Sequence, residues 1–102
     1  MTSGCYTFCN CVNLSFFDVD LPELRNGTGM FSGCDNLYSF TGNLPHIENG
    51  NDMFSSCGKL TSVSSDLSTL TSGSGMFRET SLQSFDTPLT LITDASYMFE
   101  GC

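Results

Sequence analysis

The sequence has very few basic residues. Its 102 residues include three Lys and Arg against eleven Asp and Glu, which gives a net charge of −8 at pH 7. Nucleic acids and anionic membrane surfaces are recognised through clusters of Lys and Arg, so the charge argues against both as partners. Trp is absent, and no apolar run approaches the ~20 residues that a membrane-spanning helix needs. We therefore expect no nucleic-acid partner and no insertion into a membrane.

Sequence motifs of enzymes are also missing. There is no P-loop, no glycine motif for nucleotides and no zinc-protease motif. The single histidine, His46, lies between Pro45 and Ile47. It has no Cys or Ser motif to pair with, so we expect it to point outward. The chain is predicted to be no enzyme and to carry neither cofactor nor metal.

The N-terminal stretch MTSGCYTFCNC lacks the basic region and the apolar segment of a secretory signal peptide. Two interpretations follow from it. Either the chain is not secreted by itself, or it is a fragment of a longer secreted chain.

What the sequence does contain is a repeat of 23 residues. Met30, Met53 and Met76 are each 23 residues apart, and Met98 follows after 22. The shorter step reflects one residue lost near positions 78–80. Other columns in the same register are Phe8, Phe31, Phe54, Phe77 and Phe99; Leu14, Leu37, Leu60 and Leu82; Phe17, Phe40, Val63 and Phe85; Leu21, Leu44, Leu67 and Leu89; and Leu24, Ile47, Leu70 and Ile92.

A unit of this length cannot bury its apolar columns alone, but stacked units give each apolar side chain an identical neighbour above and below. We predict a repeat solenoid, mainly β, with about four stacked coils of 22–23 residues built from short parallel strands and turns. It forms a single domain over residues 1–102, with units at about 7–29, 30–52, 53–75 and 76–97 and the start of a fifth at 98–102. The predicted core ladder is Phe31, Phe54, Phe77, Phe99, Cys11, Cys34, Cys57, Leu37, Leu60 and Leu82.

Each coil is expected to hold two short strands and one helical or 3₁₀ turn after Met-Phe. The segments LTSV at 60–63 and LQSF at 82–85 favour strands. Pro22, Pro45 and Pro88 exclude helix at or next to the Leu-Pro segment. Gly27, Gly50 and Gly73 share a column, which predicts a backbone position with positive φ.

The string MFSGCDNLYSFTGNLPHIENGNDMFSSCGKLTSV at 30–63 resembles the BspA-type, or Treponema-type, leucine-rich repeats. It is most similar to their Met-Phe-x-x-Cys subgroup, as in bacterial surface lipoproteins. The resemblance covers residues 7–102. The first unit departs from the pattern with TFCNC in place of MFSGC, and the unit that begins at Met76 lacks its Cys.

This resemblance implies a binding module of a cell-surface or secreted protein, with adhesion to a protein or glycan on a host or neighbouring cell as its role. The alternative is a structural spacer or assembly element of a larger surface or phage particle protein. For binding, the candidate surface is the outward strand face between the core columns: Tyr38, Ser39, Thr41, Thr61, Ser62, Ser64, Gln83 and Asp86.

The cysteines leave alternatives open. Stacked Cα atoms ~4.8 Å apart fall within disulfide range, but a column in an apolar register favours buried free thiols. Near the N-terminus, Cys5, Cys9 and Cys11 are crowded. A local disulfide of Cys5 with Cys9 or Cys11 is the alternative to free thiols there, and a metal site would need a fourth ligand.

Two further columns are polar. Asn26, Asn49, Ser72 and Asp94 are expected to form a side-chain hydrogen-bond ladder. The acids Asp20 and Asp66, like Asp18 and Asp86, share columns that we interpret as solvated.

The ending YMFEGC starts a coil. We expect that it serves as a makeshift cap, that the chain continues as part of a longer protein, or that copies associate end to end.

Overall fold

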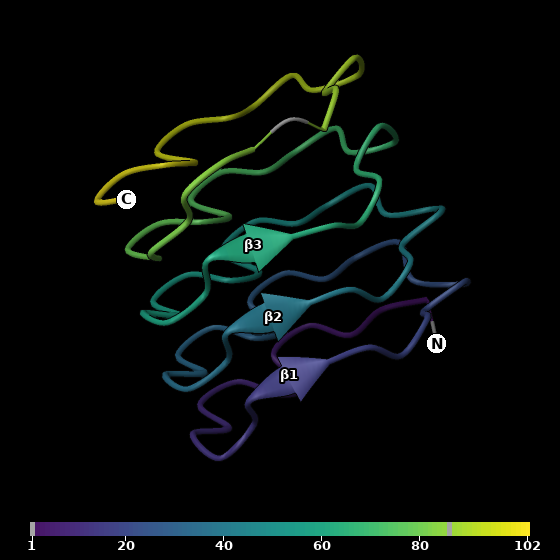
Figure 1. The fold of residues 1–102 in the computed structure, drawn as a ribbon. Helices are drawn as coiled ribbons and strands as arrows, with labels where there is room; N and C mark the ends of the chain where they lie inside the picture. Colours follow the sequence, from purple (N-terminus) through teal and green to yellow (C-terminus); the bar gives the residue numbers. More distant parts are fainter. Residues whose placement is uncertain (1, 86) are drawn as a thin grey trace.

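The computed structural model describes residues 2–85 and 87–102. The chain winds into a stack of similar coils, with its two ends at opposite ends of the stack (Figure 1). Three two-residue strands, β1 (Phe16–Phe17), β2 (Ser39–Phe40) and β3 (Ser62–Val63), form a parallel sheet in the order β1-β2-β3. Each residue pairs with the one 23 positions away. The predicted mainly β solenoid with the 23-residue register is therefore confirmed.

A second line of parallel pairing runs through single residues of successive coils. These isolated bridges join Ser3, Asn26, Asn49, Ser72 and Asp94 in order. Each coil was expected to hold two short strands, but it has at most one two-residue strand and one bridge. Residues 82–85 form no strand, although the Gln83 N–H donates to the Thr61 carbonyl at 3.2 Å.

The expected helical turn after Met-Phe is absent from the described residues, and the hydrogen bonds explain why. The N–H groups there alternate between two directions. Those of Met30 and Ser32 donate within the coil to the carbonyl three residues earlier, at 3.0 and 3.1 Å. Those of Gly29 and Phe31 donate to the next coil, at 2.9 and 2.8 Å. A helix needs every N–H for its own i−4 carbonyl, so stacking replaces the helix with turns.

The core is made of columns of identical side chains. Phe54 stacks between Phe31 and Phe77 with ring centroids 5.5 and 5.6 Å apart and interplanar angles of 3° and 5°. It also meets Phe40 edge-on at 5.0 Å and 67°. Aromatic pairs favour offset-stacked and edge-to-face arrangements of this kind. The contacts within the column of Phe54, and between it and the column of Phe40, therefore stabilise the packing of adjacent coils.

The members of the predicted core ladder differ in burial according to their coil. Those in the middle coils are fully buried, Cys11 and Leu82 are half-buried, and Phe99 is 43% exposed. Phe99 stacks on Phe77 at 5.8 Å, and no described coil covers its other face. Its neighbour Met98 is only 2% exposed. Phe99 therefore belongs to the stacked Phe column but is packed on one side only in the described residues.

The glycine column has a different cause from the one expected. Gly27, Gly50 and Gly73 do not have positive φ. Instead, a Cβ at Gly27 would lie 3.0 Å from the Sδ of Met53, and a Cβ at Gly50 equally close to the Sδ of Met76. The residues of this column are small because the methionine side chain of the next coil packs against each of them.

Positive φ occurs in two other columns. One contains Tyr6, Gly29, Asp52, Gly75 and Tyr97; the other contains Asn10, Gly33, Ser56, Glu79 and Gly101. In the first column the side chains of Tyr6 and Asp52 lie where a Cβ on Gly29 and Gly75 would stand. In this first column glycine alternates with a larger residue, because glycine tolerates the left-handed conformation and leaves room for the side chain of its neighbour.

Candidate interaction surfaces

The strand face carries two exposed aromatic side chains. Phe16 is 54% and Tyr38 53% exposed. Phe16 pairs with Ser39, and the Tyr38 N–H donates to the Ser15 carbonyl at 2.8 Å, so the two aromatic residues lie on adjacent coils. Alternation along β1 turns Phe17 toward the core and Phe16 outward. Phe16 was not among the predicted site residues, although this alternation was readable from the sequence.

The other predicted face residues are small and polar. Thr41, Ser62, Ser64 and Gln83 are exposed, whereas Ser39 and Thr61 are half-buried. Asp86 lies outside the described residues. The face therefore combines two aromatic anchors with a field of hydroxyl groups. Such a surface offers apolar contact area together with donors and acceptors, which suits a protein or a glycan.

A groove runs along the edge formed by the Leu-Pro segments. Its first part, of about 470 Å³, is lined by Asp20, Pro22, Asn43, Leu44, Pro45 and Asp66. The second part, of about 420 Å³, is lined by Ser64, Ser65, Asp66, Ser68, Thr87 and Pro88. Because Asp66 lines both, we treat them as one feature, the Leu-Pro groove. The sequence placed its acids in columns, but it did not show that they border a hollow.

Hydrogen bonds fix the two carboxylates of the Leu-Pro groove. The Asp20 Oδ1 accepts from the backbone N–H and from the Nδ2 of Asn43, at 3.0 and 3.1 Å. The Asp66 Oδ1 accepts from the Ser68 N–H at 2.9 Å. Below them, the buried Ser65 hydroxyl donates to the Gly42 carbonyl. Both acids are thus held in place at the surface, and within residues 2–85 and 87–102 neither of them forms an ion pair.

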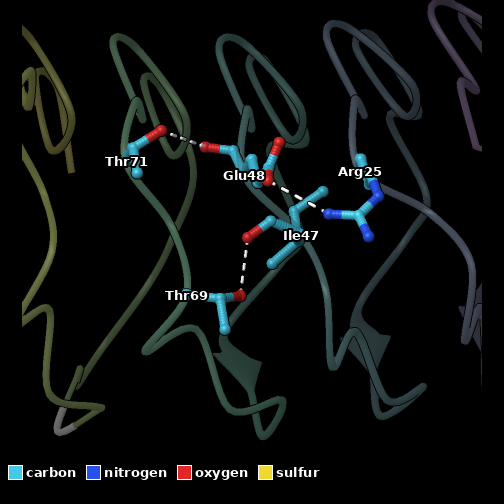
Figure 2. A network of polar contacts seen from close by, with 5 residues as sticks. All are labelled: Arg25, Ile47, Glu48, Thr69 and Thr71. Atoms are coloured by element: carbon cyan, nitrogen blue, oxygen red, sulfur yellow. Dashed lines mark hydrogen bonds and ion pairs between the residues drawn. The ribbon is translucent and has the colours of Figure 1, made fainter.

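The basic residues lie elsewhere and are engaged with other partners. Arg25 forms an ion pair with Glu48 of the next coil at 3.1 Å, and Arg78 pairs with Glu100 at 2.9 Å. Figure 2 shows the first ion pair beside two hydrogen bonds between coils. The Thr69 hydroxyl donates to the Ile47 carbonyl, and the Thr71 hydroxyl donates to the Glu48 carbonyl.

The third basic residue, Lys59, donates to the Oδ1 of Asn36 at 2.8 Å. The three basic side chains therefore tie coils together, and none of them is among the described residues that line the Leu-Pro groove.

Two thiols in the middle of the cysteine column, Cys34 and Cys57, are buried. All six cysteines are free. The Sγ of Cys34 donates to the Phe8 carbonyl at 3.0 Å and that of Cys57 to the Phe31 carbonyl at 3.1 Å. Burial raises the pKa of Cys34 above its ordinary value and that of Cys57 to about 12. These two thiols stay protonated at neutral pH and are poor nucleophiles.

The asparagine column is a structural ladder. The Asn26 Oδ1 accepts from the N–H and the hydroxyl of Thr28 at 3.0 and 2.7 Å. The same hydroxyl reaches the Asn49 Oδ1 of the next coil at 3.2 Å. In the last such turn, hydrogen bonds from Ser96 lower the pKa of Asp94. The polar groups of this column are used in hydrogen bonds within and between turns, so we assign them a structural role and not a role in ligand binding.

Residues suited to metal binding or catalysis are not brought together. Within residues 2–85 and 87–102, no three His, Cys, Asp or Glu side chains are placed to hold a metal ion. His46 is exposed, as expected. In the same part of the chain, no helix is long and apolar enough to cross a membrane. The strand face and the Leu-Pro groove are two surfaces of the described residues that offer recognition chemistry.

Comparison with known proteins gives one match. A family model described as a BspA type leucine-rich repeat region of six copies matches residues 2–102. No curated protein and no solved structure matches the chain significantly.

Proposed function

Because the chain belongs to the BspA-type leucine-rich repeat family, whose repeats serve as protein-interaction modules, we propose that it is a recognition module for a protein or glycan ligand. Repeats of this family are generally non-enzymatic, and proteins that carry them are commonly surface-associated. The finer role that we propose is adhesion at a cell surface. Membership of the Met-Phe-x-x-Cys subgroup stays a prediction.

The observation that carries the proposal is the exposed pair Phe16 and Tyr38 on the strand face. Aromatic anchors contribute much of the binding energy at interfaces. Sheet pairing fixes the backbone of Phe16, and the hydrogen bond from the Tyr38 N–H to the Ser15 carbonyl fixes that of Tyr38, so little ordering is needed on binding. The surrounding Ser and Thr hydroxyls supply the polar contacts that would orient a ligand.

The proposal is tested by presenting the chain to arrays of glycans and of extracellular matrix proteins. The double variant Phe16→Ser/Tyr38→Ser should lose about 2 kcal/mol or more of binding free energy, about 30-fold in Kd. The matched control is Val12→Ser/Leu91→Ser, whose side chains are 47% and 56% exposed outside the strands.

The control variant should bind as the parent chain does, and far-UV circular dichroism should show that both variants stay folded. Unchanged binding by the Phe16→Ser/Tyr38→Ser variant would contradict the proposal. If the parent chain binds nothing on either array, the role of spacer or assembly element is favoured instead.

A further inference from the structure

The Leu-Pro groove points to a second ligand, independent of the strand face. We propose that it binds a proline-rich segment of a partner protein in the polyproline II conformation, with Lys or Arg at every third residue. The segment would lie along the stack axis and place successive cations at Asp20 and Asp66.

The spacing of the carboxylates carries the proposal. Asp20, Asn43 and Asp66 occupy one column of three successive coils and line the same hollow. Parallel neighbours lie ~4.8 Å apart, which places Asp20 and Asp66 ~9.6 Å apart along the axis. A polyproline II helix rises ~3.1 Å per residue with three residues per turn, so side chains three apart project from one side at ~9.3 Å.

Other occupants fit this spacing less well. In an extended β-strand, side chains on the same face recur every ~6.7 or ~13.4 Å, and neither distance matches. A single metal ion would need both carboxylates within a few ångströms. Two separate cations on one rigid ligand therefore fit the carboxylate pair better than either.

Beside the column of Asp20, Asn43 and Asp66, the groove is lined by apolar side chains. Leu44 is 1% exposed and forms part of the groove wall, and Pro22 and Pro45 contribute their exposed rings. Proline-rich ligands dock in apolar grooves because their helix is already formed and loses little entropy on binding. The groove therefore offers an apolar contact for the proline rings and acids for the cations.

The electrostatics favour a cationic ligand. Among the described residues, no Lys or Arg lines the groove. The hydrogen bonds of Asp20 and Asp66 within this part of the chain use Oδ1 in both cases, so Oδ2 of each is open to an incoming ammonium or guanidinium group. Charge complementarity of this kind raises association rates and fixes register.

The test uses two labelled nonapeptides of equal charge and composition, with fluorescence anisotropy at low ionic strength as the readout. One peptide is three repeats of Pro-Pro-Lys; in the other, three consecutive Lys are flanked by three Pro on each side, so that no two Lys are three residues apart. The regularly spaced peptide should bind at least about threefold more tightly, because only it can reach both carboxylates from one side.

Two double variants locate the site. Asp20→Asn/Asp66→Asn keeps the acceptors for Asn43 and Ser68 but removes both charges, and it should weaken the regular peptide about three- to tenfold. The control Asp35→Asn/Asp52→Asn makes the same change in net charge at exposed positions outside the groove, and it should change the affinity by less than about twofold.

The outcomes separate the two proposals. The strand-face variant Phe16→Ser/Tyr38→Ser should bind the regular peptide with the affinity of the parent chain. A negative result for the strand face would therefore leave the groove proposal standing, and the reverse. The groove proposal is overturned if neither peptide binds, if both peptides bind equally, or if the two Asp→Asn double variants weaken binding to the same degree. That last result would assign binding to the overall charge of −8.

Discussion

Replacing Gly50 with alanine tests why glycine recurs along the stack. A Cβ at this position would lie 3.0 Å from the Sδ and 3.1 Å from the Cε of Met76. Real Cβ atoms essentially never approach closer than that limit, and Met76 is itself fully buried. Since Gly50 does not have positive φ, the alanine meets no backbone strain. Its cost comes from crowding with side chains of the next coil, first with Met76 and then with the Cδ1 of Leu70 at 3.2 Å.

The expected magnitude follows from two opposing effects. Adding a methyl group to a packed core costs about 1–3 kcal/mol. Replacing glycine by alanine stabilises by about 0.4–1 kcal/mol, because the unfolded chain has fewer conformations. The Gly50→Ala variant should therefore lose about 0.5–2 kcal/mol of unfolding free energy. Gly58 is the matched control, since a Cβ there has no neighbour within 4 Å; Gly58→Ala should gain about 0.4–1 kcal/mol.

The assay is urea unfolding followed by far-UV circular dichroism, run as a double-mutant cycle with Met76→Ala. Met76→Ala alone should cost about 2–5 kcal/mol by leaving a cavity. In that background the added methyl at position 50 enters vacated space. Gly50→Ala should then be neutral or stabilising, with a coupling energy of about 1–3 kcal/mol between the two sites.

Two results would refute this reasoning. If Gly50→Ala lowers the unfolding free energy by the same amount in the parent chain and in the Met76→Ala background, contact with Met76 is not the cause of the loss. If Gly58→Ala destabilises as much as Gly50→Ala, glycine is needed for its backbone freedom.

Three further predictions follow from burial and pKa. Phe54→Ala should cost about 3–5 kcal/mol in urea unfolding, whereas Phe99→Ala should cost less than about 1.5 kcal/mol because Phe99 is 43% exposed; equal losses would contradict the single-sided stacking of Phe99. Burial raises the pKa of Cys57 from 9.0 to about 12, so the folded state retains a proton that the unfolded state loses above pH 9. The unfolding free energy should fall as pH rises above about 9 toward 12, and less steeply in a Cys57→Thr variant; identical slopes would rule this out. Hydrogen bonds from Ser96, first from its backbone N–H and then from its side chain, lower the pKa of Asp94 below the ordinary 3.8; because Ser96→Ala removes only the side-chain hydrogen bond, an NMR titration should show the pKa of Asp94 still below 3.8 in that variant, and a full return to 3.8 would contradict the leading role of the backbone N–H.

Much of the fold was predictable because the sequence repeats. Translation by one coil brings each residue beside the residue 23 positions away, as in the pairing of Phe16 with Ser39 and Ser39 with Ser62. A column of Phe or Leu therefore reads directly as a ladder of contacts. Burial of Cys34 and Cys57 follows from the same register, and the family match over residues 2–102 agrees with it.

The candidate surfaces were predictable only in part. Alternation along β1 places Phe16 outward, whereas Tyr38 lies just before β2 and is exposed between the buried residues Leu37 and Phe40. The Leu-Pro groove was not predictable, because a hollow depends on how the Pro22 and Pro45 corners of successive coils are spaced in three dimensions. The column of Asp20 and Asp66 was visible in the sequence, but its position beside that hollow was not.

The sequence by itself determined the period, the register and which columns are apolar, because stacking identical units makes neighbours of residues one period apart. Only the tertiary structure decided what each column does in its coil. It showed that Gly50 is small because Met76 covers it, and that alternate N–H groups turn to the next coil and prevent a helix after Met-Phe. These features depend on contacts between coils, and such contacts require the distance and direction of the neighbouring chain.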